Sequence, residues 1–279
     1  MVELSHSNPI TACGYNQTFG QVVTADDHGI VKVWDIETGR KTFEFSANVP
    51  VTCLRFDDSH RRLVLGCRDG VTRVFNHNNG GLLNELKPLK TGREVTVVYQ
   101  LVIGQAKYFL SLGWDRRINL FPEHDKKHII EQNANPYWHD DLKNGHKEDI
   151  LAAAILNNNL LASASFDGEI IIWNLISGHT SQKINCREGK QKTTSNPFHI
   201  IETGGPFITT LACYRKILIA GHCNGNILLF NTLGTNKKLI RNLPLLFRPK
   251  SVPNEFDKSI RLLNFCPSHK FFIYKKFSR

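Results

Sequence analysis

A hairpin pattern that occurs five times along the chain constrains its fold more than any other feature. Its fullest form is LLASASFDGEIIIWN, residues 160–174. Asp167-Gly168 is a tight-turn signal, because glycine tolerates positive φ and aspartate hydrogen-bonds its own backbone. The apolar stretch before this turn and the β-branched and aromatic residues after it favour strands. The pattern therefore predicts two antiparallel strands joined by a tight turn.

The other four copies place an aromatic residue at the same offset from the turn. They read VVTADDHGIVKVWD from residue 22, LVLGCRDGVTRVFN from 63, FLSLGWDRRINLF from 109 and LIAGHCNGNILLFN from 218. A further strand precedes and follows each hairpin, so we expect four antiparallel strands per repeat. Periods of about 40 to 60 residues are typical of repeat folds, and four short strands per repeat indicate a β-propeller blade. The aligned aromatic residues are Trp34, Phe75, Phe121, Trp173 and Phe230.

These repeats predict an all-β chain that forms a single propeller domain over residues 1–279. We expect about five complete four-stranded blades and a partial sixth, and therefore an incomplete propeller or a fragment of a larger one. In the third blade, residues 128–132 are predicted to form the fourth strand. The predicted blades are 6–46, 47–88, 93–132, 146–185, 205–243 and a partial 258–279, with insertions at 133–149, 186–204 and 244–257.

Several short motifs identify a family that the chain resembles. They are Trp34-Asp35, Trp173-Asn174, Asp69-Gly70, Asp167-Gly168 and Gly145-His146. These motifs resemble those of the WD-repeat family of β-propellers, and the resemblance covers nearly the whole chain. The widely spaced repeats and large insertions are similar to those of ciliary and axonemal WD-repeat proteins. The resemblance implies a non-catalytic scaffold that binds other proteins on the top face of the propeller.

The resemblance also implies a structural tetrad in the fourth blade, formed by His146, Ser163, Asp167 and Trp173. In the first blade His6, Thr24 and Trp34 match it, while His28 replaces the turn aspartate. Serine, histidine and aspartate are also the residue types of a hydrolase triad. No Gly-x-Ser-x-Gly motif surrounds Ser163, which lies in a predicted interior strand, so we expect a structural role and no enzyme activity.

No motif indicates a cofactor or a metal site. His124 and His128 have the spacing of two metal ligands, but no further ligands accompany them, so we interpret the segment as a polar loop.

The three insertions all join the last strand of one blade to the first strand of the next. In the resembled family such loops lie on one face, which makes that face the candidate binding surface. The aromatic candidates are Tyr137 and Trp138, although the alternative is that they fold down onto the blade. The basic candidates are Arg187, Lys190 and Lys192.

The formal net charge is +10, and the excess positive charge lies after residue 182. This charge is suited to an acidic protein surface or to nucleic acid, and a nucleic-acid-associated role in RNA processing is the alternative function. Solvated loop charges that contribute only solubility would give the same count. The seven cysteines include no Cys-x-x-Cys pair, and neither a signal peptide nor a membrane span is recognisable. We therefore expect an intracellular, cytoplasmic location, with the cilium or cytoskeleton included, and no membrane partner.

Overall fold

The computed structural model describes eleven segments of the chain, and all of their regular structure is β-strand. The chain divides into two compact units, Met1–Asp140 and Asp141–Arg279, which are described separately. Nothing in the described segments is a helix long and apolar enough to cross a membrane. The described residues are 6–88, 93–123, 131–133, 145–157, 159–186, 207–214, 217–223, 227–231, 239–243, 260–266 and 271–276.

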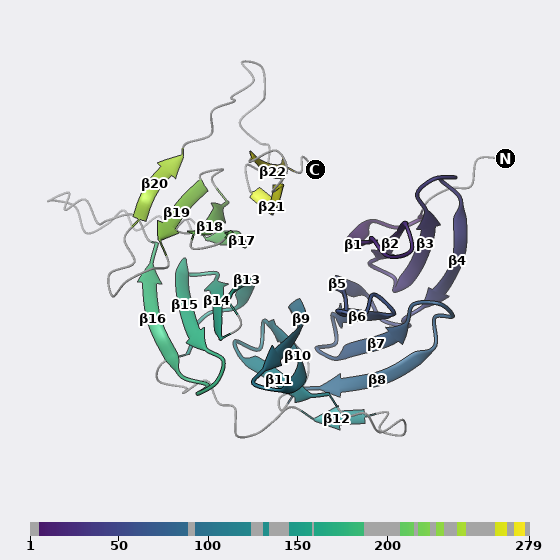
Figure 1. Ribbon diagram of the computed structural model, residues 1–279, viewed down its shortest axis with the longest axis horizontal. Helices are drawn as coiled ribbons and strands as arrows, with labels where there is room; N and C mark the ends of the chain where they lie inside the picture. Colours follow the sequence, from purple (N-terminus) through teal and green to yellow (C-terminus); the bar gives the residue numbers. More distant parts are fainter. Residues whose placement is uncertain are drawn as a thin grey trace, which may run out of the picture. The chain divides into compact units, whose positions relative to one another are not determined.

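The first sheet of unit 1, blade one, is an antiparallel sheet of four consecutive strands (Figure 1). Val22 pairs with Trp34 and Thr24 with Lys32, so these four side chains lie on one side of the sheet. The strands are β1 (Ile10–Asn16), β2 (Gln21–Asp26), β3 (Ile30–Asp35) and β4 (Lys41–Ser46).

Blade two has the same four-stranded core, and a short fifth strand joins its outer edge. This fifth strand, β12 (Glu131–Asn133), pairs in parallel with β8 (Leu82–Lys87). The prediction that residues 128–132 complete the third blade is therefore wrong for the part that the structure describes. The outer edge of β8 offers unpaired backbone groups, and β12 satisfies some of them there. The other strands are β5 (Val51–Phe56), β6 (Arg62–Cys67) and β7 (Thr72–Asn76).

Blade three contains three antiparallel strands in the described residues, in the order β11-β10-β9. Its hairpin turn lacks the glycine that the other turns carry, and Arg116 adopts a left-handed φ of 65° there. A positive φ costs conformational free energy for a non-glycine residue, so this turn is less favourable than one with glycine at the same position. The strands are β9 (Val95–Ile103), β10 (Ala106–Gly113) and β11 (Ile118–Pro122).

Unit 2 contains two further four-stranded antiparallel sheets, blades four and five, and a final two-stranded sheet (Figure 1). The two strands of the last sheet confirm the predicted partial sixth repeat. Blade four comprises β13 (Ile150–Asn157), β14 (Leu160–Ser165), β15 (Glu169–Asn174) and β16 (Thr180–Asn185). Blade five comprises β17 (Ile208–Tyr214), β18 (Ile217–His222), β19 (Ile227–Asn231) and β20 (Leu239–Leu243), and the last sheet β21 (Ile260–Cys266) and β22 (Phe271–Lys276).

Each sheet packs against the next within its unit, and the same side of the sheet is used every time. We call the side that contacts the following sheet the forward face, and the opposite side the rear face. In blade one the forward face carries Val23, Ala25, Val31 and Val33, which form one core cluster with Leu63, Leu65 and Phe75 on the rear face of blade two. Blades two and three pack in the same way, as do blades four and five. Alternation along each strand therefore divides its side chains between two interfaces.

Candidate functional site

The predicted residues of blade four come together in a buried hydrogen-bonded chain. The indole Nε1 of Trp173 donates to Ser163 Oγ at 2.7 Å, and Ser163 Oγ lies 2.6 Å from His146 Nε2. Because Ser163 Oγ accepts the indole hydrogen, its own hydrogen is available to donate to His146. Burial lowers the pKa of His146 to about 4, so the imidazole is neutral and can accept this bond.

Asp167, the fourth predicted member, lies in the turn between β14 and β15. Its Oδ1 accepts hydrogen bonds from Ser165 Oγ at 2.6 Å and from the backbone N–H of Glu169 at 3.3 Å. The Nδ1 of His146 has no hydrogen-bond partner in the described residues, so Asp167 acts on that ring through its charge, which opposes the lowering of the His146 pKa. The structure thus joins three of the four residues directly.

Blade one contains an equivalent chain with a carboxylate that sequence reasoning missed. The Nε1 of Trp34 donates to Thr24 Oγ1 at 2.8 Å, and His6 Nε2 lies 2.7 Å from the same oxygen. The other ring nitrogen of His6, Nδ1, lies 3.0 Å from Asp26 Oδ2. His28, which stands at the expected aspartate position, instead contacts Asp27 at the surface.

Asp26 takes over the role of the turn carboxylate from two residues earlier in the chain. It also accepts hydrogen bonds from the backbone N–H groups of His28 and Ile30. Burial alone would raise the pKa of Asp26, but these bonds and the bond to His6 outweigh burial and lower the pKa. The signal was present in the sequence, since a carboxylate at the end of the second strand can reach the turn backbone as an Asx turn.

The Ser163–His146 pair cannot act as an accessible nucleophile and base in this structure. Ser163 is fully buried, His146 is 7% exposed, and the serine oxygen is already engaged by the Trp173 indole. A hydrolase needs its serine open to substrate and next to donors for an oxyanion. The arrangement instead satisfies three buried polar groups, which stabilises the sheet.

The described residues contain no group of three or more potential metal ligands. His124 and His128 lie outside the described residues, and so do the predicted partner-binding residues Tyr137, Trp138, Arg187, Lys190 and Lys192. The six cysteines whose side chains are described are free thiols.

A position that is exposed or half-buried occurs at the same point of the hairpin turn in each of the five blades whose turn the structure describes at that point. Its backbone N–H donates to the residue just before the first strand of that blade, as Trp114 does to Glu94 at 2.9 Å. The side chains at this position are Asp27, Arg68, Trp114, Phe166 and Cys223. The fixed backbone therefore presents a different side chain from each blade, and we call these residues the turn array.

Two members of the turn array lie in one pocket of unit 1. Arg68, Arg93, Glu94 and Trp114 line a cavity of about 430 Å³ between the turns of blades two and three. Trp114 is 39% exposed, and the side chain of Arg68 is 57% exposed, with its Nε 3.8 Å from Glu94 Oε2. Burial raises the pKa of Glu94, and Arg68 opposes this rise. Two arginines against one glutamate leave the pocket positive.

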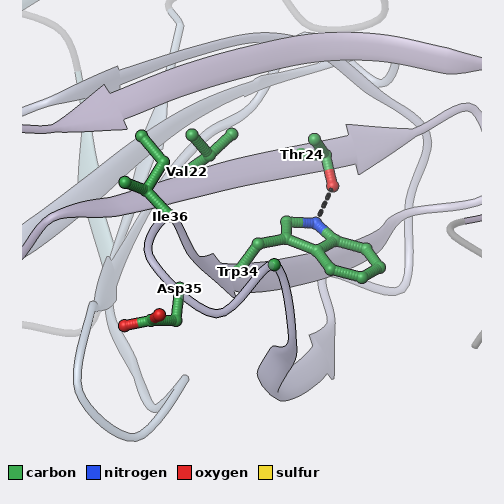
Figure 2. A pocket seen from close by; sticks show the side chains of 6 residues that line it. Val22, Thr24, Trp34, Asp35 and Ile36 are labelled. Carbon is green, nitrogen blue, oxygen red and sulfur yellow. Dashed lines mark hydrogen bonds between the residues drawn. The ribbon is translucent and has the colours of Figure 1, made fainter.

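A second cavity, of about 360 Å³, lies on the rear face of blade one (Figure 2). Val22, Thr24, Trp34 and Ile36 line it, and Figure 2 shows the Trp34–Thr24 hydrogen bond beside it. Gly39, in the turn between β3 and β4, forms part of its wall. The cavity is shallow and mostly apolar, and Asp35 completes its lining, with a carboxylate that turns away from Trp34 (Figure 2).

Comparisons with known proteins agree with this geometry. A family model described as "WD domain, G-beta repeat" matches residues 2–35, 39–76 and 141–174. The proteins named "WD repeat-containing protein on Y chromosome" from Drosophila willistoni and Drosophila mojavensis are 25% and 26% identical over 198 residues, 67% of this chain. The match spans 17% and 15% of those relatives, so their activity as whole proteins is not carried over.

Among solved structures, the computationally designed Ika8 protein superposes with a TM-score of 0.65 at 20% identity, covering 97% of this chain and 69% of that one. At this identity the likeness shows the fold alone. The family match, the relatives, the fold and the repeated Trp–hydroxyl–His chains all support the WD-repeat family for this chain, and the family model matches three stretches of it directly.

Proposed function

We propose that the chain is a non-catalytic scaffold that binds other proteins through its turn array. WD-repeat proteins generally act as protein-interaction scaffolds, and this chain fits that role. The turn array carries the proposal, because it presents Arg68, Trp114 and Phe166 from equivalent rigid positions. Trp114 is 39% and Phe166 is 49% exposed. Exposed tryptophan and arginine side chains on a rigid framework are typical anchors of protein interfaces.

The chemistry of the array favours an acidic partner with apolar side chains. In unit 1, Arg68 and Arg93 line the same pocket as Trp114, so an acidic side chain and an apolar neighbour can bind together there. In unit 2, Phe166 stacks on Phe207 with ring centroids 4.8 Å apart, which holds its ring in place at the surface. An interface of this kind keeps its ordering cost low, because the anchors are already positioned.

Quantitative co-purification from cell extract tests this proposal. A variant with Arg68→Ser, Trp114→Ser and Phe166→Ser should lose partners that the parent chain retains. The matched control replaces exposed residues elsewhere, Leu82→Ser and Ile176→Ser, which are 44% and 63% exposed. The control should retain the partners. Equal recovery by the parent and by both variants would contradict the role of the turn array.

The nucleic-acid alternative rests on charge. Basic and acidic residues balance in residues 1–140, so the whole formal excess of +10 lies in residues 141–279. Titration of labelled RNA across a salt series tests it, because phosphate contacts make affinity fall steeply with salt. Binding that follows salt in this way and is unaffected by the turn-array variant would favour the nucleic-acid role over the scaffold.

The cellular setting that goes with the scaffold proposal is a cytoplasmic or ciliary assembly. It is supported by the spacing of the repeats, which is similar to that of ciliary and axonemal WD-repeat proteins. Imaging a tagged chain in ciliated cells tests this setting. A signal confined to another compartment would remove the ciliary part while leaving the interaction proposal intact.

A further inference from the structure

The rear face of blade one differs from every other rear face that the structure describes. In blade two the equivalent residues Leu63, Leu65 and Phe75 are at most 4% exposed. The rear-face residues Phe109 and Phe121 of blade three, Leu161 and Trp173 of blade four, and Leu218 and Phe230 of blade five are also buried. In blade one the residues Val22, Thr24 and Trp34 are only half-buried, and Tyr15 on the same side is 53% exposed.

The packing between blades one and two shows what a rear face accepts. Phe45 of β4 reaches the rear face of blade two, where its ring lies 5.0 Å from that of Phe75. There it abuts Gly80, since a Cβ added to Gly80 would meet the Phe45 side chain at 2.7 Å. The outer strand of blade one thus inserts a large apolar side chain beside a turn glycine of blade two. Leu86 and Ile184 hold the position of Phe45 in blades two and four, and both join the corresponding core clusters.

Blade one has the same receptor, and none of the residues that the structure describes fills it. Trp34 occupies the position of Phe75, and Gly39 occupies the position of Gly80. A Cβ added to Gly39 would meet nothing within 4 Å, although its φ of +67° matches the +65° of Gly80. The cavity of about 360 Å³ lies where the ring of a residue equivalent to Phe45 would lie (Figure 2).

A hydrogen-bond position is repeated as well. Thr11 of β1 donates its hydroxyl to the carbonyl of Val51, the first residue of blade two. Thr52, the equivalent residue of blade two, donates to the carbonyl of Val95, the first residue of blade three. Ile10 is the equivalent first residue of blade one, which makes its carbonyl the matching acceptor on the rear face.

We infer that the rear face of blade one binds a blade-like β-sheet of a partner polypeptide. That sheet carries small and β-branched residues on its inner strands, as the forward faces of this chain do. Its outer strand carries a large apolar side chain that enters the cavity beside Trp34 and Gly39. A second copy of this chain is the weaker choice, because the forward faces of blades one, two and four are already buried against the next sheet. This surface is distinct from the turn array.

The chain's own first sheet serves as the probe. In a tandem variant, residues 6–46 occur twice in succession, so that residues 6–9 join the copies as residues 47–50 join blades one and two. The first copy carries Trp34→Phe, which keeps the number of tryptophans equal to that of the parent. We expect a single urea transition at a higher midpoint than the parent, and reduced quenching of the remaining Trp34 by acrylamide. The added sheet should also resist limited proteolysis.

Two substitutions in the first copy make the test specific. Phe45→Asp should return the urea midpoint and the quenching of Trp34 to the parent values, because it removes the side chain that fills the cavity. Gln17→Asp adds the same charge at an exposed turn and should leave the tandem effect intact. An unchanged midpoint with Trp34 still quenched would overturn the inference, and so would a Phe45→Asp variant that behaves like the tandem.

The oligomeric state of the parent chain distinguishes a partner polypeptide from the other possible occupant of this face, a second copy of the chain. Sedimentation over a range of concentrations should give a monomer that Trp34→Asp does not alter. A dimer that dissociates when Trp34→Asp is introduced would show that the face binds a second copy, which overturns the partner assignment.

Discussion

Ser163→Ala is the substitution whose cost follows most directly from the structure. It removes one oxygen that serves two buried groups, the indole N–H of Trp173 and the imidazole Nε2 of His146. Trp173 is 1% and His146 is 7% exposed, so water has little access to either group. Leaving a buried polar group without its partner costs about 1–3 kcal/mol. We therefore expect the free energy of unfolding to fall by about 3 kcal/mol in total.

Urea denaturation measures this change, with the midpoint and the m-value compared between variants. Ser177→Ala, at an exposed turn, is the matched control and should change the free energy of unfolding by less than about 0.5 kcal/mol. Thr24→Ala removes the equivalent oxygen of blade one and should cost less than Ser163→Ala, because Trp34 is half-buried and His6 keeps Asp26. A Ser163→Ala variant as stable as the parent would refute the reasoning, as would a loss of some enzymatic activity without any loss of stability.

Two other predictions concern titratable groups. The pKa of His146 is about 4 in the folded chain and 6.5 ordinarily, so below pH 6.5 the unfolded chain binds more protons than the folded chain. The free energy of unfolding should therefore fall towards pH 4, by up to about 3 kcal/mol. Because the lowered pKa of His77 acts in the same direction, the test compares the parent with His146→Gln, whose free energy of unfolding should depend less on pH; parallel curves for the two would contradict the prediction. Asp57→Asn should lower the free energy of unfolding by about 3 kcal/mol, because the fully buried carboxylate pairs with Arg62 at 2.8 Å and accepts hydrogen bonds from backbone N–H groups. Asp58→Asn, at an exposed position, is the control. An equal effect of the two substitutions in urea denaturation would refute this prediction.

The sequence predicted the repeated hairpins because the relevant signals are local. Asp167-Gly168 with the strands around it folds as expected, and Trp34 and Trp173 occupy equivalent positions. Pairing between distant segments was harder to predict. The short β12 has no sequence pattern that fixes its register, and it pairs with the free edge of β8 in another blade. The shift of the carboxylate from position 28 to Asp26 was missed because the alignment compares positions, whereas the hydrogen bond depends on reach.

Part of the candidate site also depends on information that a sequence pattern does not carry. The turn array emerges from one repeated backbone hydrogen bond, which places Arg68, Trp114 and Phe166 at equivalent points although their side chains share nothing. The open place on the rear face of blade one could not be recognised from the sequence, because this requires knowing which side of each sheet its neighbour covers. The predicted single domain, and the partner-binding roles of Tyr137, Trp138, Arg187, Lys190 and Lys192, stay predictions.

A matched pair of glycine substitutions tests the central claim that Phe45 of blade one packs beside the turn glycine Gly80 of blade two, whereas the equivalent place beside Gly39 of blade one is open. Gly39→Ala and Gly80→Ala both place a side chain at a positive φ, which costs about 1–2 kcal/mol each. Only Gly80→Ala also collides with Phe45, whereas Gly39→Ala enters open space. Urea denaturation should therefore show Gly80→Ala to be the more destabilising of the two, by at least about 1 kcal/mol. Equal losses, or a larger loss for Gly39→Ala, would contradict both the packing of Phe45 beside Gly80 and the open rear face of blade one.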